Sequence, residues 1–178
     1  SRNPCRFARV TFDFMLTLLL LQTTLEACQK FSLHRDALSL LKRGLRTRLE
    51  LARKLDARGH AETDIEQTIA RLEAVGFVND ARLAQDRAQI AVDRSVGRHK
   101  IERKLAEAGV DDATIRKSVD DAYEPVDEAR TARELLRARL AQYSRVDAFT
   151  AHRRAIGFLL RRGFGDEIVH SAVVEVLG

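Results

Sequence analysis

Residues 51–65 read LARKLDARGHAETDI, a stretch in which two leucines, a glycine and an isoleucine follow one another at helical spacing. The same order returns in IERKLAEAGVDDATI at residues 101–115. A weaker copy, AIGFLLRRGFGDEI, occupies residues 155–168. Its gap from Gly163 to Ile168 is one residue shorter than the matching gap in the other two copies. A glycine after an apolar helical stripe can adopt the left-handed conformation that ends a helix. Each copy therefore predicts a helix, a glycine turn and the start of another helix.

Polar residues that commonly begin helices stand beside these stripes. Thr47 and Glu50 have the spacing of a capping box, in which side chain and backbone at the helix start bond reciprocally, and Thr63 with Glu66 repeats it. Further helix starts are expected at Asn79 and Asp80 before a helix over 81–94, at Asp111 and Asp112 before Ile115, at Asp166 before Ile168, and at Pro125. Together with the three copies, these starts predict three successive groups of three helices.

The composition agrees with a helical protein. The chain is 45% hydrophobic and 32% charged, with nine Gly, two Pro and no Trp. Sandwiches and barrels need more turn residues and β-branched runs than this. Groups of three short helices bury little surface alone, so neighbours must share apolar faces, as in other repeat arrays. We therefore predict an all-α fold, an elongated curved array of three tandem three-helix repeats at residues 35–79, 80–123 and 124–178, after an atypical extension at residues 1–34.

The first residues differ from the rest of the chain. Three arginines precede the apolar run 14–21, which is too short to cross a bilayer. Basic residues before a short apolar run also outline a signal peptide, and Leu25-Glu26-Ala27-Cys28 resembles a lipoprotein cleavage site. Asp13 and Glu26 oppose export, because such segments are neutral at these places. We expect a cytoplasmic protein with no membrane attachment; an exported lipoprotein or a membrane-attached adaptor is the alternative.

No arrangement of residues indicates a catalytic or metal site. The two cysteines, Cys5 and Cys28, are too few for a disulfide-stapled module, and with the five histidines they lack zinc-ligand spacing. No phosphate-binding glycine loop or nucleophile motif is present, and Gly163-Phe164-Gly165 is best explained as a turn between helices. We therefore expect a binding protein rather than an enzyme, with no cofactor and no metal; an enzyme with an unrecognised site is the alternative.

Basic residues gather at similar places in the predicted groups. The net charge is +5, and only six of the 31 basic residues are lysines. Arginine makes bidentate contacts with phosphates and carboxylates. A stripe of such residues along one side of the array can follow a polyanion backbone or a repeating acidic protein surface; scattered, solvated side chains are the alternative. The candidate partner-binding or DNA-binding residues are Arg46, Arg48, Arg53, Lys54, Arg98, Lys100, Arg103, Lys104, Arg161 and Arg162.

Several short motifs, taken in order, resemble the RecX family over residues 35–178. They are Ala37-Leu38-Ser39-Leu40-Leu41, Arg46-Thr47, Glu50-Leu51, Lys54-Leu55 and Gly59; Gly76-Phe77-Val78-Asn79-Asp80 with Arg82-Leu83-Ala84; Gly97-Arg98-His99-Lys100-Ile101; Leu105-Ala106-Glu107-Ala108-Gly109-Val110; and Leu160-Arg161-Arg162-Gly163-Phe164 before Ile168. Each motif alone is an ordinary helix pattern with a cap. It is the order and spacing of the motifs together that are specific to the family. Thr47 stands where the family more often has Ser, which keeps the capping hydroxyl. Residues 1–34 do not resemble the family's usual leader.

The resemblance implies a bacterial regulator of the RecA recombinase that acts in DNA repair, DNA recombination and the SOS response. Family members are not enzymes. They are built of tandem three-helix repeats, bind in the groove of the RecA–single-stranded DNA filament, and suppress its ATP hydrolysis, strand exchange and co-protease activity. On this basis we expect a monomer whose partner is the RecA filament, with weak binding to single-stranded DNA alone. A general nucleic-acid-binding helical repeat protein without a RecA target is the alternative.

Overall fold

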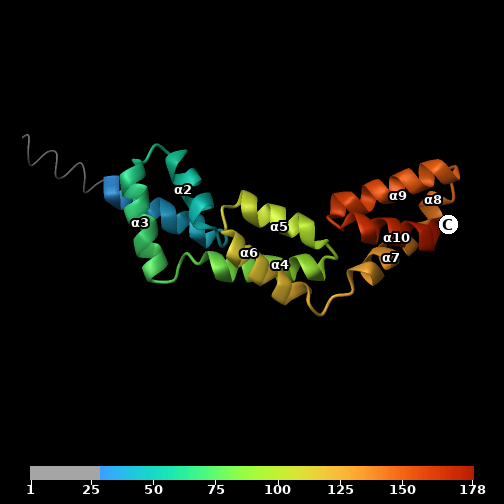
Figure 1. Ribbon diagram of the computed structural model, residues 1–178. Coiled ribbons are helices and arrows are strands. Elements are labelled where there is room, and N and C mark those ends of the chain that lie inside the picture. Colours follow the sequence, from blue (N-terminus) through green and yellow to red (C-terminus); the bar gives the residue numbers. More distant parts are fainter. Residues whose placement is uncertain (1–28) are drawn as a thin grey trace, which may run out of the picture. The chain divides into compact units, whose positions relative to one another are not determined.

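The computed structural model describes residues 29–178, and every regular element in that part of the chain is helical (Figure 1). The all-α class predicted from the sequence is therefore confirmed. The chain divides into two compact units, and the division falls between Val78 and Asn79. The predictions for the apolar run and for Cys28 concern residues 1–28, which lie outside the described residues. In the part that is described, no helix has both the length and the apolar character needed to cross a bilayer.

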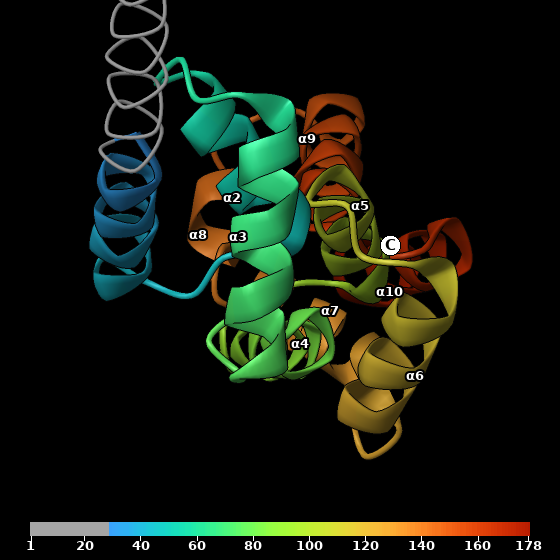
Figure 2. The same cartoon turned by 90° about the vertical axis from the view of Figure 1, so that its left-hand side faces the viewer.

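The first unit packs three helices around one core. These are a helix that includes residues 29–42, α2 (Arg48–Asp56) and α3 (Glu62–Ala74) (Figure 2). Leu33, Leu51 and Leu55 are at most 1% exposed in this core. Burying one leucine side chain stabilises a fold by about 1.5–3 kcal/mol, so a few such residues hold three short helices together. Because Leu33 belongs to this core, the first helix begins before residue 35, where the first predicted repeat starts.

The second unit contains two cores, each formed by its own helices (Figure 1). The first is surrounded by α4 (Asp80–Asp93), α5 (Arg98–Glu107) and α6 (Asp112–Tyr123). The second is surrounded by α7 (Glu128–Arg137), α8 (Leu140–Tyr143), α9 (Ala148–Arg162) and α10 (Asp166–Leu177). The apolar spacing does not predict the short α8, which has a single buried residue, Tyr143, in the second core.

The three sequence copies fold alike. Gly59, Gly109 and Gly163 all have left-handed backbone, with φ of 81°, 82° and 92°, as predicted for residues that end a helix. The residues buried at equal distances from these glycines are Leu51, Ile101 and Ala155; Leu55, Leu105 and Leu159; and Ile65, Ile115 and Val169. Val169 rather than Ile168 fills the last place, because Ile168 is only partly buried. The shorter gap predicted for the third copy is therefore wrong, and all three copies share one spacing.

The predicted capping box of α2 is confirmed. The Thr47 hydroxyl accepts a hydrogen bond from the Glu50 N–H at 3.1 Å, and the Glu50 carboxylate accepts one from the Thr47 N–H at 3.2 Å. Asn79 and Asp111 likewise accept bonds from N–H groups in the first turns of α4 and α6, both at 2.9 Å. In each case the side chain takes up a donor that the helix start leaves open.

The caps predicted at Thr63 and Asp166 and the helix start predicted at Pro125 are wrong. The N-cap of α3 is Ala61, so Thr63 lies inside the first turn and does not cap the helix. Asp166 is the first residue of α10 rather than its cap, although a carboxylate there still interacts favourably with the helix dipole. Pro125 lies in the turn after α6, and α7 begins after Asp127, whose carboxylate accepts a bond from the Arg130 N–H at 2.8 Å.

The two threonines supply a test of this assignment. Thr47→Ala removes a buried capping side chain, so we expect it to lower the free energy of unfolding by about 1 kcal/mol or more. Thr63→Ala leaves every cap in place and is expected to change the free energy by no more than about 0.5 kcal/mol. Urea unfolding of the full chain, followed by circular dichroism, measures both. Equal losses for the two variants would contradict the assignment of the cap.

Candidate partner-binding surface

Two pairs of basic side chains stand at equivalent places on α2 and α5. Arg53 and Lys54 are exposed on α2. Arg103 and Lys104 stand at the same distance before their own glycine and are exposed on α5. The Arg103 Nε lies 3.7 Å from Glu107 Oε1, and both of these side chains are about two-thirds exposed, so the ion pair is weak in water. All four basic residues thus lie exposed on the surface of their helices.

The third copy lacks this pair. Gly157 and Phe158 occupy the equivalent places of α9. Two guanidinium groups lie over the Phe158 ring instead, that of Arg139 at 4.1 Å and that of Arg162 at 5.5 Å from the ring centre. Such contacts are typically worth about 0.5–1 kcal/mol at exposed sites. This pair of basic residues therefore recurs in α2 and α5 but not in α9.

Arg46 and Arg48 flank Thr47 at the start of α2 and have different surroundings. The Arg48 Nη1 donates to Glu73 Oε2 at 2.7 Å, which joins α2 to α3. Arg46 is half-buried, and its buried Nε has no hydrogen-bond partner. Arg48 therefore contributes to the packing of the first unit, whereas Arg46 keeps a donor that the described residues do not use.

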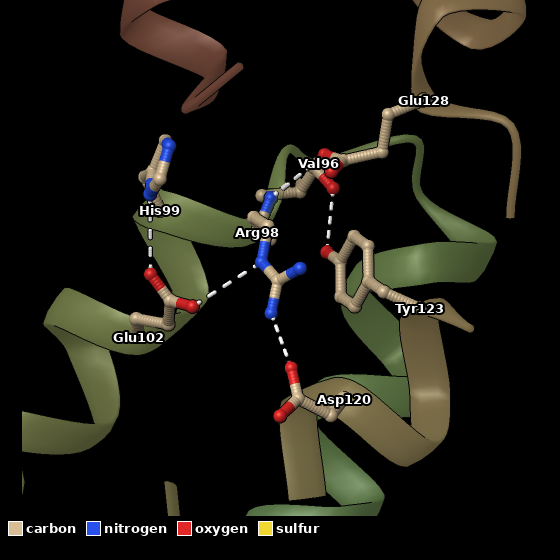
Figure 3. Close-up of polar contacts among 7 residues, drawn as sticks. All are labelled: Val96, Arg98, His99, Glu102, Asp120, Tyr123 and Glu128. Carbon is tan, nitrogen blue, oxygen red and sulfur yellow. Dashed lines mark hydrogen bonds and ion pairs between the residues drawn. The ribbon is translucent and has the colours of Figure 1, made fainter. Parts of the chain in front are cut away.

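Arg98 is held in a network of carboxylates inside the second unit (Figure 3). Its Nε donates to Glu102 Oε1 at 3.3 Å, and its Nη2 donates to Asp120. The hydrogen bond with Asp120 is the main cause that raises the pKa of Arg98, followed by the bond with Glu102. Its backbone N–H donates to Glu128 Oε1 at 3.1 Å, from the first residue of α7. The charge of Arg98 is thus offset within the unit.

The start of α5 is capped by α9. The N-cap residue of α5 is Gly97, which has no side chain that can accept a hydrogen bond. The Gly97 N–H donates to the Arg162 carbonyl at 2.9 Å, and the His99 N–H donates to the Gly163 carbonyl at 3.2 Å. The negative end of α9 thereby meets the positive end of α5, and each satisfies groups that the other leaves open. We call this contact, formed by residues 97–100 and 161–163, the α5–α9 joint.

Two glycines allow the α5–α9 joint to close. A Cβ atom on Gly97 would lie 2.3 Å from the carbonyl carbon of Gly163, and one on Gly163 would lie 2.3 Å from the Cβ of Lys100. Both distances are far shorter than the van der Waals contact of two carbon atoms, about 3.5–4.0 Å. Only glycine therefore fits at either position without moving a helix.

Two of the predicted binding residues complete the α5–α9 joint. The Lys100 Nζ donates to the Arg161 carbonyl at 2.8 Å. The Arg162 Nη1 donates to the carbonyls of Arg94 and Ser95 at 2.9 and 2.8 Å, at the end of α4. A cation at a helix C-terminus is favourable because the last carbonyls carry partial negative charge. Lys100 and Arg162 therefore connect α4, α5 and α9 within one unit.

The candidate residues thus divide by their surroundings. Arg98, Lys100 and Arg162 are engaged inside the second unit, whereas Arg53, Lys54, Arg103, Lys104 and Arg161 are exposed. Gly97, Gly163 and Glu128 were not among the predicted site residues. The sequence offers one signal, for Gly97, which stands in the second copy where the first copy has the capping residue Thr47. Within residues 29–178, no group of three or more His, Cys, Asp or Glu side chains is arranged to hold a metal ion.

Comparison with known proteins connects these features to one family. A family model described as the first three-helix domain of RecX matches residues 35–72, and one described as the third three-helix domain of RecX matches residues 127–173. The chain is 35% identical to the Regulatory protein RecX of Thermobifida fusca (strain YX) over 141 residues, which cover 79% of this chain and 76% of the relative. It is also 35% identical to the Regulatory protein RecX of Stenotrophomonas maltophilia (strain K279a) over 133 residues, 74% of this chain and 80% of the relative.

A solved structure shows the same fold. The crystal structure of RecX from Lactobacillus salivarius matches with a TM-score of 0.69 and 23% identity, covering 84% of this chain and 97% of that one. At this identity the likeness concerns the fold alone, and it supports the helical repeat architecture.

Alanine at two glycines tests the α5–α9 joint. Gly97 and Gly165 are both N-cap residues with nearly the same backbone, φ −71° and ψ 152° against φ −69° and ψ 152°. A Cβ on Gly165 would meet only the His99 imidazole, at 3.2 Å. We expect Gly97→Ala to destabilise the protein by about 1–3 kcal/mol more than Gly165→Ala, because only the former forces two backbones apart. Urea unfolding measures the difference, and equal effects would contradict the close contact.

The two tyrosines supply a second test. The Tyr123 hydroxyl is buried and donates to the Val96 carbonyl at 2.6 Å, and burial, followed by the charge of Glu128, raises the pKa of Tyr123 to about 12 (Figure 3). Burial also raises the pKa of Tyr143. Since these are the only tyrosines, the folded chain is expected to show less tyrosinate absorbance at pH 10 than the unfolded chain, whose tyrosines are about half ionised there.

The corresponding effect on stability has a definite sign. A folded-state pKa above the unfolded value means that the contribution of Tyr123 is complete below pH 10 and is lost as the pH rises through about 12. Tyr123→Phe should remove the titration step near pH 12 that ultraviolet absorbance detects. A native titration centred at the unfolded value would contradict the buried hydroxyl.

Proposed function

The chain belongs to the RecX family, and we propose that it is a regulator that binds in the groove of the RecA–single-stranded DNA filament and inhibits RecA. The inhibited activities are ATP hydrolysis, strand exchange and co-protease activity, so the protein acts in DNA repair, recombination and the SOS response. It works by binding and not by catalysis. A role on this filament requires access to RecA and DNA, so we place the protein in the cytoplasm, as a monomer without a cofactor.

The repeated basic pairs of α2 and α5 are the observation that carries this proposal. Arg53 with Lys54 and Arg103 with Lys104 stand at one place of two successive helical groups and are exposed in both. A filament presents the same acidic groups once per protomer and the same phosphates along its DNA. Matched charges on one chain can therefore contact several equivalent sites, and each further contact gains from the effective concentration set by the first.

Rigidity within the second unit explains how such contacts would inhibit. The α5–α9 joint and the Arg162 bonds to the end of α4 hold α4, α5 and α9 together. A body of this kind that bridges neighbouring protomers fixes their arrangement and obstructs the movements that ATP turnover needs. Arg98, Lys100 and Arg162 serve this rigidity, and Arg46, Arg48, Arg53, Lys54, Arg103, Lys104 and Arg161 are the residues that we propose to face the filament.

The second candidate function is a nucleic-acid-binding helical repeat protein that has no RecA target. It is favoured by the basic side chains of α2 and α5 alone, since phosphates attract them without a protein partner. The two functions predict different binding preferences for the protein. A regulator of RecA binds RecA-coated DNA clearly more tightly than bare strands. A general nucleic-acid-binding protein binds bare strands equally well or better, with an affinity that depends steeply on salt.

The direct test is ATP hydrolysis by RecA on single-stranded DNA. We expect inhibition at less than one molecule of this protein per RecA protomer. Reversal of charge in R53E/K54E or in R103E/K104E should raise the half-inhibitory concentration about tenfold or more, because like charges then face the filament. Raising the salt concentration should weaken the inhibition by the wild type as well.

The matched control is R116E/K117E. Both residues are exposed on α6, and the substitution changes the net charge by the same amount. Its half-inhibitory concentration should stay within about twofold of the wild type, since scattered surface charges act weakly. The absence of inhibition by the wild type, or equal losses for control and test variants, would contradict the proposal.

A further inference from the structure

The short helix α8 forms one wall of an apolar hollow in the second unit. The start of α9 and the end of α10 form the others, and the hollow has a volume of about 550 Å³. Its lining residues are Leu140, Ala141, Tyr143, Ser144, Val146, Ala148, Ala151, His152, Val176, Leu177 and Gly178. We call it the α8 hollow. Within residues 29–178, the other two helical groups have three helices each and no counterpart of α8, so the hollow distinguishes the third group.

The lining of the α8 hollow suits an apolar occupant. None of the described residues that line it has a charged side chain, although 32% of the chain is charged. The side chains of Ser144 and His152 are used within the chain: the Ser144 hydroxyl donates to the Ala141 carbonyl at 3.4 Å, and the His152 Nδ1 donates to the Ala148 carbonyl at 2.9 Å. A pocket for a polar small molecule keeps such groups directed at its ligand. The α8 hollow therefore fits an apolar side chain better.

A large apolar side chain stands beside the α8 hollow. Phe149, the second residue of α9, is 77% exposed. Residues three apart on a helix are surface neighbours, so Phe149 borders the lining residue His152. Leu140, which itself lines the hollow, is 40% exposed. Exposed apolar groups that gather in this way mark a contact with another molecule.

A projecting ring next to a hollow makes this surface self-complementary. When two copies meet about a two-fold axis, every contact between two residues occurs twice. The Phe149 ring of each copy can then enter the α8 hollow of the other, and one interface covers both rings and both hollows. A different partner would have to supply a ring and a hollow of its own at the matching distance. The surface therefore fits a second copy of this chain.

Charge at the rim of the α8 hollow permits such a contact. Arg145 and Asp147 are exposed on either side of the lining residue Val146. Hydrogen bonds from Thr150 lower the pKa of Asp147, so its carboxylate is charged at neutral pH. The rim thus carries both signs of charge, and a second copy meets no field of a single sign. The basic pairs of α2 and α5, by contrast, would repel their equivalents in another copy.

We propose that two copies of the free protein associate through their α8 hollows, with Phe149 of each copy seated in the hollow of the other. This goes beyond the proposed function, because the interface uses none of the basic residues assigned to the filament. The monomer proposed above is the form on the filament, and the pairing concerns the free protein. The interface is small, so the pairing is weak and reversible.

The test is sedimentation velocity of the full chain at a series of concentrations, without RecA or DNA. We expect the wild type to pair with a dissociation constant between about 1 and 100 µM. Phe149→Asp should weaken the pairing at least about tenfold, because it removes the aromatic anchor and places a charge at the interface. A carboxylate is favourable in the first turn of a helix, so this variant is expected to fold.

A second variant fills the α8 hollow without adding charge. Ala148 is exposed and lines the hollow, so Ala148→Trp should also weaken the pairing at least about tenfold. Non-specific association would instead strengthen, because the variant has more apolar surface. The matched control is Ile90→Asp, at a residue of α4 that is 48% exposed and lies outside the hollow. Its pairing should stay within about twofold of the wild type, and circular dichroism shows whether each variant is folded.

Four results would overturn the proposal. The first is a wild type that stays monomeric up to about 500 µM, and the second is pairing that Phe149→Asp and Ala148→Trp leave unchanged. The third is pairing that is lost in L18D/L20D, in the apolar run 14–21, but kept in Phe149→Asp, since the run would then join the copies. The fourth is weaker inhibition of RecA by Phe149→Asp with unchanged sedimentation, since the hollow would then face the filament. Sedimentation does not involve RecA, so this proposal and the proposed function fail in different assays.

Discussion

The close approach of Gly97 to Gly163 is the constraint on which the second unit depends. It lets the carbonyls at the end of α9 reach the N–H groups at the start of α5, and it leaves no room for a side chain at either residue. Lys100 and Arg162 then bond across the same contact. Two helix ends, each carrying unsatisfied groups of opposite polarity, are thereby buried against each other with few polar groups left open. Several hydrogen bonds within this contact offset the free-energy cost of bringing the two helix ends together.

The same repeat therefore carries different tasks in different copies. In the first copy α2 caps itself through Thr47 and Glu50, and its Arg53 and Lys54 lie among the basic residues that line a hollow of the first unit. In the second copy glycine replaces the capping threonine, and carbonyl groups at the end of α9 cap the start of α5. The apolar residues keep their places in all copies, because the core of each helical group needs them there. The polar residues between them can change, since they face solvent or a neighbouring group, and function resides in those changes.

The apolar spacing was enough to predict the helical class, the repeated burial and the left-handed glycines, because these follow from local geometry. Capping was predictable where the cap lies next to its helix in the chain, as at Thr47 and Asp111. The prediction failed at Thr63 because α3 begins earlier, after Ala61, so that Thr63 lies inside the first turn despite its capping-box spacing to Glu66. The internal contacts of Arg98, Lys100 and Arg162 were not predicted, for another reason. Their partners lie 22 to 68 residues away in the chain, and charge counts do not reveal which cations a fold will use internally.

The α5–α9 joint can be observed directly by amide hydrogen exchange of the free protein. Backbone amides at a helix start exchange rapidly when nothing accepts their hydrogen bonds. If α9 caps α5 in solution, the amides of Gly97 and His99 will exchange as slowly as that of the buried Leu105 in the same helix. Exchange of these two amides on the timescale of an open helix end, with Leu105 still protected, would show that the two helices are not joined and would contradict the account.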